Sequence, residues 1–124
     1  MIDDNERILV LAAQILSHAG FVPSIVPSGR RALSLLNKCV FDAIIVDFFM
    51  PGMTGDELVR AVRGHRNPAV SKVPVLGLSG SCKTDALFVR SGANACIHKP
   101  LQERRLLSAV RRLLPAAAAA HVAT

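Results

Sequence analysis

Five polar residues are placed so that they could meet at one edge of a sheet. Asp3 and Asp4 lie near the start of the chain, while Asp47, Ser79 and Lys99 each follow a short apolar run. Neighbouring carboxylates repel one another unless a cation lies between them, and Mg²⁺ is a hard cation that prefers such oxygen ligands. A lysine and a hydroxyl suit an oxyanion, and an aspartate can accept a phosphoryl group as a nucleophile. These residue types predict Mg²⁺-assisted phosphoryl transfer.

Apolar periodicity predicts the elements that would position these residues. Pro23 lies within the first predicted strand, which favours an edge position because proline lacks an N–H. Strands alternate with helices, so we expect an α/β fold with a parallel sheet, whose strand carboxyl ends share one edge. The predicted helices are 7–19, 29–38, 56–63, 84–91 and 101–114, and the predicted strands are 21–26, 42–47, 73–79 and 96–98.

Length and composition exclude several classes of protein. The 124 residues suit one domain, and the 51% apolar share is enough for a core. No apolar run approaches the roughly 20 residues that span a bilayer, and the N-terminus lacks the pattern of a signal peptide. We therefore expect a cytoplasmic protein with no membrane segment. The three cysteines, Cys39, Cys82 and Cys96, are widely spaced, and we expect buried free thiols in a reducing compartment.

The chain is basic, with a net charge of +6 from 15 Lys and Arg against 9 Asp and Glu. Such a charge could indicate nucleic acid. However, Tyr and Trp are absent, and no base-stacking platform or helix-turn-helix pair is visible. Several of the bases lie in the last predicted helix, so we expect an acidic protein partner and no direct contact with nucleic acid.

Five short motifs occur along the chain: D-D-N-E at 3–6, V-D-F-F-M-P-G-M-T-G at 46–55, L-S-G at 78–80, S-G-A-N-A at 91–95 and H-K-P at 98–100. Together they resemble the motifs of the receiver domain of two-component response regulators, which also occurs in hybrid histidine kinases. The resemblance extends over about residues 2 to 114, and the D-x-x-M-P-x-M-x-G pattern is its most specific part. It predicts a receiver domain over 1–114, followed by an alanine-rich tail over 115–124 that we expect to be frayed or a linker.

The resemblance implies a role for each residue at the phosphorylation site. Asp47 would be the phosphoacceptor, Lys99 would pair with the phosphoryl group, and Ser79 would swing toward it. The donor would be a histidine kinase or a phosphotransfer protein. The chain would then be a signalling module, not an enzyme, that assists its own phosphorylation and dephosphorylation.

The resemblance also implies a metal site and a sheet topology. Asp4 and Asp47 would coordinate Mg²⁺ directly, Asp3 would act mostly through water, and the backbone carbonyl of Phe49 would be a further ligand. The fold would be a doubly wound, flavodoxin-like parallel sheet of five strands in the order 2-1-3-4-5.

Three features depart from the family pattern. Only Met1 and Ile2 precede the acidic pair, where the family has a whole internal strand. Its loss would cost several kcal/mol, so we expect a truncated chain, a misplaced start, or a strand from another chain in a homodimer. Cys96 replaces the usual aromatic switch residue, which puts the aromatic readout in doubt. Phe49 borders the phosphoryl site and would slow the attack of water, so we expect a long-lived phosphoaspartate.

Three alternatives remain at this point. The run from Gly77 to Ser81 nearly matches a G-x-S-x-G nucleophile elbow, but its last position is Ser and no Asp-then-His order follows. A phosphatase that turns over at Asp47 lacks a second carboxylate at close spacing. A pseudo-receiver, which acts by protein interaction without phosphorylation, fits the short first strand and Cys96.

Overall fold

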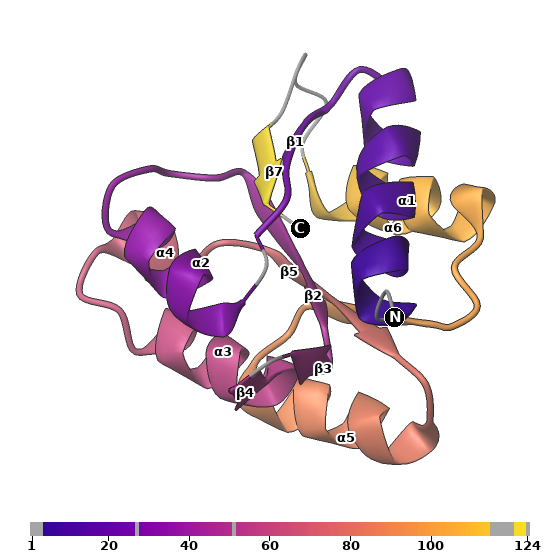
Figure 1. Ribbon diagram of the computed structural model, residues 1–124. Coiled ribbons are helices and arrows are strands. Elements are labelled where there is room, and N and C mark those ends of the chain that lie inside the picture. The colour runs from indigo at the N-terminus through magenta and orange to yellow at the C-terminus, as the bar shows by residue number, and fades with distance from the viewer. Residues whose placement is uncertain (1–3, 27, 51, 115–120, 124) are drawn as a thin grey trace.

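The computed structural model describes residues 4–26, 28–50, 52–114 and 121–123, with side chains described except at 4–6, 121 and 123. One parallel sheet has the strand order β1-β7-β2-β5-β6, and a two-stranded hairpin pairs β3 with β4 (Figure 1). The strands are β1 (Val22–Ser24), β2 (Ala43–Asp47), β3 (Phe49–Met50), β4 (Met53–Thr54), β5 (Val75–Ser79), β6 (Ala95–His98) and β7 (His121–Ala123). The helices are α1 (Asp4–His18), α2 (Gly29–Leu36), α3 (Gly55–Arg63), α4 (Pro68–Ser71), α5 (Cys82–Ser91) and α6 (Glu103–Leu113).

The five-stranded α/β architecture confirms the predicted fold class, and β1 with Pro23 lies at an edge as expected. All five strands of the main sheet run parallel, so their carboxyl ends lie along one edge. The predicted helices and strands are all present, with bounds shifted by a few residues. The β3–β4 hairpin and the short α4 were not predicted.

Each face of the sheet packs against its own set of helices. β2 is buried throughout, and its side chains alternate between the faces: Ile44 and Val46 join one apolar cluster, while Ala43 and Ile45 join the other. The first cluster includes side chains of α2, α3, α4 and α5, and the second includes those of α1 and α6. A strand buried on both faces is a rigid support for the residue at its end.

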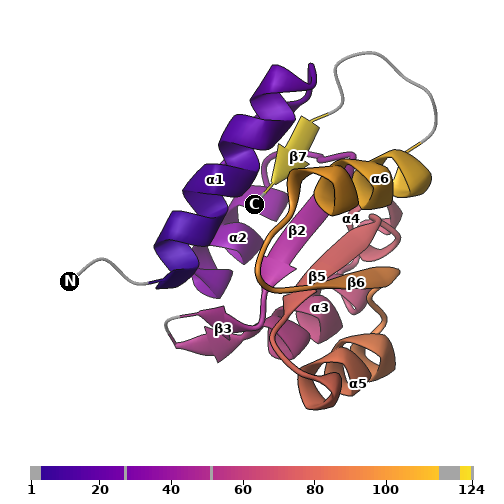
Figure 2. The same cartoon turned by 90° about the vertical axis from the view of Figure 1, so that its right-hand side faces the viewer.

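The C-terminal segment corrects the prediction of a frayed tail. β7 lies between β1 and β2, where Val122 is opposite Pro23 on one side and Ala43 on the other. The Val122 side chain is 0% exposed and packs in the cluster with α1 and α6, which Figure 2 shows next to β7. This internal position is the one that the resemblance assigns to the first strand. Residues His121–Ala123 of this chain occupy that position in the structure. Met1 and Ile2 lie outside the described residues.

The cysteine prediction is wrong in one respect, because none of the three thiols is fully buried. Cys39 and Cys82 are exposed, Cys96 is half-buried, and all three are free. Among the helices that the structure describes, none is both long enough and apolar enough to cross a membrane.

Candidate phosphoacceptor site

The predicted site residues meet at the carboxyl edge of the sheet. Asp47 is the last residue of β2, Ser79 is the last residue of β5, and Lys99 directly follows β6. The parallel registers pair Asp47 with Leu78 and Ser79 with His98, so the three strand ends lie at similar heights. The sequence prediction that strand ends bring these side chains together is therefore met for Asp47 and Lys99, which are in direct contact.

Asp47 is a buried carboxylate in which one oxygen has hydrogen-bond partners and the other has none among the described residues. Its side chain is 1% exposed, and Oδ1 lies 2.9 Å from Lys99 Nζ. The backbone N–H of Phe49 also donates to Oδ1, at 3.3 Å. Oδ2 is buried and has no hydrogen-bond partner among the described residues. A buried carboxylate oxygen without a partner is costly in a folded protein, so Oδ2 is positioned to receive a ligand.

Lys99 contacts the site through both its backbone N–H and its side-chain ammonium group. Its N–H donates to the Ser79 carbonyl at 2.8 Å, which continues the β5–β6 ladder to the edge. The following peptide bond, to Pro100, is cis. The Lys99 side chain is 24% exposed, so its charge is available both to Asp47 and to a group that enters from solvent.

Ser79 is near the site but its hydroxyl points to another partner. The residue is fully buried, and its Oγ lies 2.8 Å from the Ser81 carbonyl, one of two groups to which it can donate its proton. The same oxygen shares a short hydrogen bond with the Thr84 hydroxyl, in the first turn of α5. The predicted swing toward a phosphoryl group would require these bonds to break.

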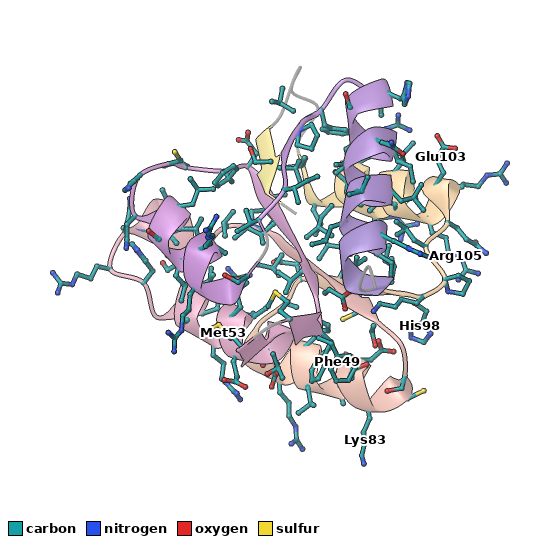
Figure 3. All side chains as sticks on the ribbon, in the orientation of Figure 1. Phe49, Met53, Lys83, His98, Glu103 and Arg105 are labelled. Carbon is teal, nitrogen blue, oxygen red and sulfur yellow. The ribbon has the colours of Figure 1, made fainter. Side chains whose placement is uncertain are left out.

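Phe49 contacts the Asp47 carboxylate through its backbone. Its backbone N–H bonds to that carboxylate, while its side chain is 59% exposed. The ring packs edge-on against Phe48, with centroids 5.1 Å apart, and Phe48 in turn packs against Phe88. Figure 3 shows Phe49 and His98 at the end of the molecule toward which β2 and β6 run. The aromatic side chain is thus exposed next to a backbone N–H that binds the Asp47 carboxylate.

The proposed metal ligands Asp3 and Asp4 are only partly placed by the structure. Asp3 lies outside the described residues, and Asp4 is the first residue of α1, with no side chain described. Both views of the ribbon place the start of α1 at the same end of the molecule as the β3–β4 hairpin (Figures 1 and 2). Among the described side chains, no group of three His, Cys, Asp or Glu residues forms a metal cluster.

Cys96 does not supply the surface of an aromatic switch. It lies in β6 and is half-buried. Burial and the neighbouring Asp85 carboxylate raise the pKa of the Cys96 thiol to about 11. The thiol is therefore neutral near pH 7 and acts as a small apolar side chain.

Sequence reasoning missed three residues beside Ser79. Thr84 forms a hydrogen bond with Ser79, and the next residue, Asp85, forms a side-chain hydrogen bond with His98 of β6. The pKa of the Asp85 carboxyl lies below its ordinary value: burial alone would raise it, but hydrogen bonding with Ser79 and His98 and the charge of His98 outweigh burial. The S-x-x-T pattern from Ser81 to Thr84 does indicate a helix cap, but nothing local indicates a contact with β6.

Comparisons of the sequence and of the structure with known proteins both identify similar proteins. A family model described as the response regulator receiver domain matches residues 1–111. The transcriptional regulatory protein HprR of Escherichia coli K12 is 34% identical over 116 residues, which cover 92% of this chain and 50% of HprR. The chemotaxis protein CheY of Pseudomonas aeruginosa is 28% identical, with 91% of this chain and 92% of CheY covered. This chain spans about half the length of several curated relatives, HprR included.

Solved structures give the same result. A response regulator from Chloroflexus aurantiacus, described as putative, superposes with a TM-score of 0.83 at 29% identity, over 90% of this chain and 92% of that one. The signal receiver domain of a histidine kinase from Syntrophus aciditrophicus superposes with a TM-score of 0.80 at 30% identity, over 91% of this chain and 86% of that one.

Proposed function

The chain belongs to the response regulator receiver domain family, and on that premise we propose that Asp47 accepts a phosphoryl group from a histidine kinase or a phosphotransfer protein. The observation that carries the proposal is the state of the Asp47 carboxylate. Lys99 and the Phe49 N–H hold Oδ1, whereas Oδ2 is buried without a hydrogen-bond partner among the described residues. The carboxylate is thus fixed by one oxygen and can react through the other.

In the proposed transfer, Asp47 supplies the nucleophile and Lys99 supplies a positive charge. Oδ2 attacks the phosphorus of a phosphohistidine, the P–N bond breaks, and the imidazole leaves with its electron pair and takes up a proton. The product is an acyl phosphate on Asp47. Lys99 remains within reach of the phosphoryl oxygens and offsets their charge. Hydrolysis removes the phosphoryl group. Water attacks phosphorus, the O–P bond breaks, and the Asp47 carboxylate and inorganic phosphate are released.

The donor atoms at this edge fit Mg²⁺. Asp47 is a buried carboxylate with an unpartnered oxygen, and Mg²⁺ is usually held by one or two carboxylates that leave room for waters and phosphate oxygens. We propose that Asp47, Asp4 and the Phe49 carbonyl would hold the ion, with Asp3 acting mostly through water. When bound, Mg²⁺ would neutralise charge on the phosphoryl oxygens.

Intact mass spectrometry tests the proposed function. After incubation with Mg²⁺ and acetyl phosphate, we expect a phosphoryl adduct on the wild-type chain and none on Asp47→Asn. Asp42→Asn is the matched control, because Asp42 is exposed and lies outside the site; this variant should be labelled as the wild type is. A folded wild-type chain that binds Mg²⁺ without forming an adduct would contradict the proposal. A chain that neither binds Mg²⁺ nor forms the adduct would be the pseudo-receiver, a module that acts by protein interaction alone.

Phe49 should prolong the life of the phosphoaspartate. Its backbone N–H binds the Asp47 carboxylate and its side chain is exposed, and we propose that the ring hinders the approach of water. We expect Phe49→Ala to hydrolyse severalfold faster than the wild type, and Phe49→Leu, which keeps most of the bulk, to stay close to the wild type. The decay of the adduct, followed by mass after removal of the donor, measures this. Equal decay in Phe49→Ala and the wild type, or loss within seconds in the wild type, would contradict the shielding role.

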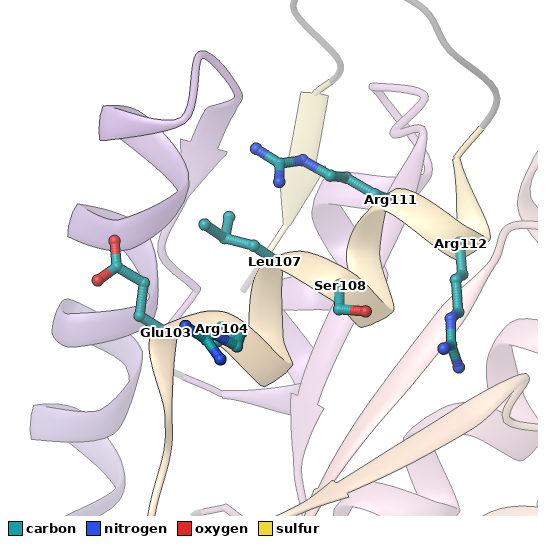
Figure 4. Close-up of a pocket in the computed structure, with 6 residues that line it drawn as sticks. All are labelled: Glu103, Arg104, Leu107, Ser108, Arg111 and Arg112. Carbon is teal, nitrogen blue, oxygen red and sulfur yellow. The ribbon is translucent and has the colours of Figure 1, made fainter.

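The partner surface is proposed to be the solvent face of α6. An open hollow lies on this helix, and Figure 4 shows the residues that line it, which are Glu103, Arg104, Leu107, Ser108, Arg111 and Arg112. Arg104, Arg111 and Arg112 are exposed and would attract an acidic protein surface. We propose that the module works by docking to such partners and assists its own phosphorylation and dephosphorylation, without turning over an external substrate.

A further inference from the structure

The orientation of the Ser79 hydroxyl is the starting point. The hydrogen-bond partners that the described residues provide for it lie in one short segment, from Ser81 to Thr84. This segment is the loop after β5 and the first turn of α5. The hydroxyl is therefore engaged with the start of α5, while the open oxygen of Asp47 is not among its partners.

A serine hydroxyl has one proton, so it can donate to one acceptor at a time. A phosphoryl oxygen on Asp47 would compete for this proton with the Ser81 carbonyl and the Thr84 hydroxyl. We propose that Thr84 is a positioning residue that holds Ser79 away from Asp47 and so opposes formation of the phosphorylated state. This inference rests on the proposed role of Asp47 as phosphoacceptor.

Thr84 is suited to this role because its own hydroxyl is held in place. It is 8% exposed and occupies the N3 position of a capping box. Its Oγ1 donates to the Ser81 carbonyl at 3.0 Å and accepts from the Ser81 N–H at 3.3 Å. A hydroxyl fixed in this way is a preorganised partner for Ser79, and its removal takes away a competitor of the phosphoryl group.

The same helical turn offers a route to the surface that does not use Cys96. Asp85, the residue after Thr84, pairs with His98, which joins α5 to β6. His98 directly precedes Lys99, and its side chain is 50% exposed. When Ser79 leaves Thr84, the first turn of α5 loses a bond, and the adjoining Asp85–His98 pair should report this change.

The test compares Thr84→Val, which keeps the shape but loses the hydroxyl, with Thr84→Ser, which keeps the hydroxyl. With Mg²⁺ and acetyl phosphate we expect Thr84→Val to be phosphorylated about fivefold faster, the value for one net hydrogen bond. Thr84→Ser should match the wild type. A purely structural role has the opposite sign, because loss of the cap would weaken α5 and slow the reaction. The His98 imidazole NMR signal should shift when the wild type is phosphorylated and stay unchanged in Asp47→Asn.

The outcomes separate this inference from the proposed function. An adduct on the wild type with equal or slower rates in Thr84→Val would overturn the role of Thr84 and leave Asp47 as phosphoacceptor. An adduct that leaves the His98 signal unchanged would overturn the route through Asp85 and His98. The absence of any adduct on Asp47 would overturn both proposals. If Thr84→Val does not fold, as shown by its urea transition, an altered rate in Thr84→Ser would count against the inference.

Discussion

Val122→Asp should lower the free energy of unfolding by about 3 to 5 kcal/mol, because it places a charge at a fully buried position in the middle of the sheet. Folded domains have only about 5 to 15 kcal/mol in total, so the variant should be near the limit of folding. β7 pairs with β2 at Ala43 and Ile44, which are four and three residues before the phosphoacceptor. We therefore expect phosphoryl uptake to fall together with stability.

Val40→Asp is the matched control for this result. It makes the same chemical change at a side chain that is 61% exposed, and surface substitutions of this kind usually alter stability by less than about 0.5 kcal/mol. Urea unfolding followed by circular dichroism measures both variants. Equal midpoints for Val122→Asp and Val40→Asp would show that β7 does not complete the sheet in solution.

The strand ends that carry the site residues were predictable because each is marked by a short apolar run in the local sequence. Asp47, Ser79 and Lys99 each end a short apolar run, and parallel topology alone then brings such ends to one edge. The contact between Asp47 and Lys99 follows from this placement. The orientation of Ser79 does not follow, since it depends on a hydroxyl of the next helix.

β7 was not predictable because its sequence contains almost no strand signal. The segment from Ala116 to Thr124 is mostly alanine, with Val122 as its single β-branched apolar residue. What makes His121–Ala123 a strand is the open position between β1 and β2, which offers backbone partners on both sides. Such a position exists only after the rest of the sheet has formed, so local propensity cannot reveal it. The Asp85–His98 pair was missed for the same reason, because it joins two elements that meet only in the fold.

Gly55→Ala should damage the site and the core together. The N–H of Gly55 donates to the Phe48 carbonyl at 2.6 Å, which fixes the start of α3 against the end of β2. A Cβ at Gly55 would lie 2.5 Å from the Asp47 carbonyl oxygen and 2.9 Å from the Phe48 Cα, so backbone atoms would have to move. We expect a loss of about 1 to 3 kcal/mol in the free energy of unfolding. Because misplacement by about 1 Å can cost up to 100-fold in rate, phosphoryl uptake should slow by about tenfold or more.

Gly64→Ala separates the effect of this contact from that of glycine replacement in general. Gly64 ends α3 with φ of −88°, and a Cβ there would meet only the Arg60 and Ala61 carbonyl oxygens, at 3.6 and 3.8 Å. These are ordinary contacts, so Gly64→Ala should keep the wild-type midpoint and the wild-type rate of phosphorylation. If Gly55→Ala were phosphorylated as fast as Gly64→Ala, the position of Asp47 would not depend on the close approach of α3. A slow Gly55→Ala with a normal urea midpoint would instead assign the whole effect to the placement of the Asp47 carboxylate.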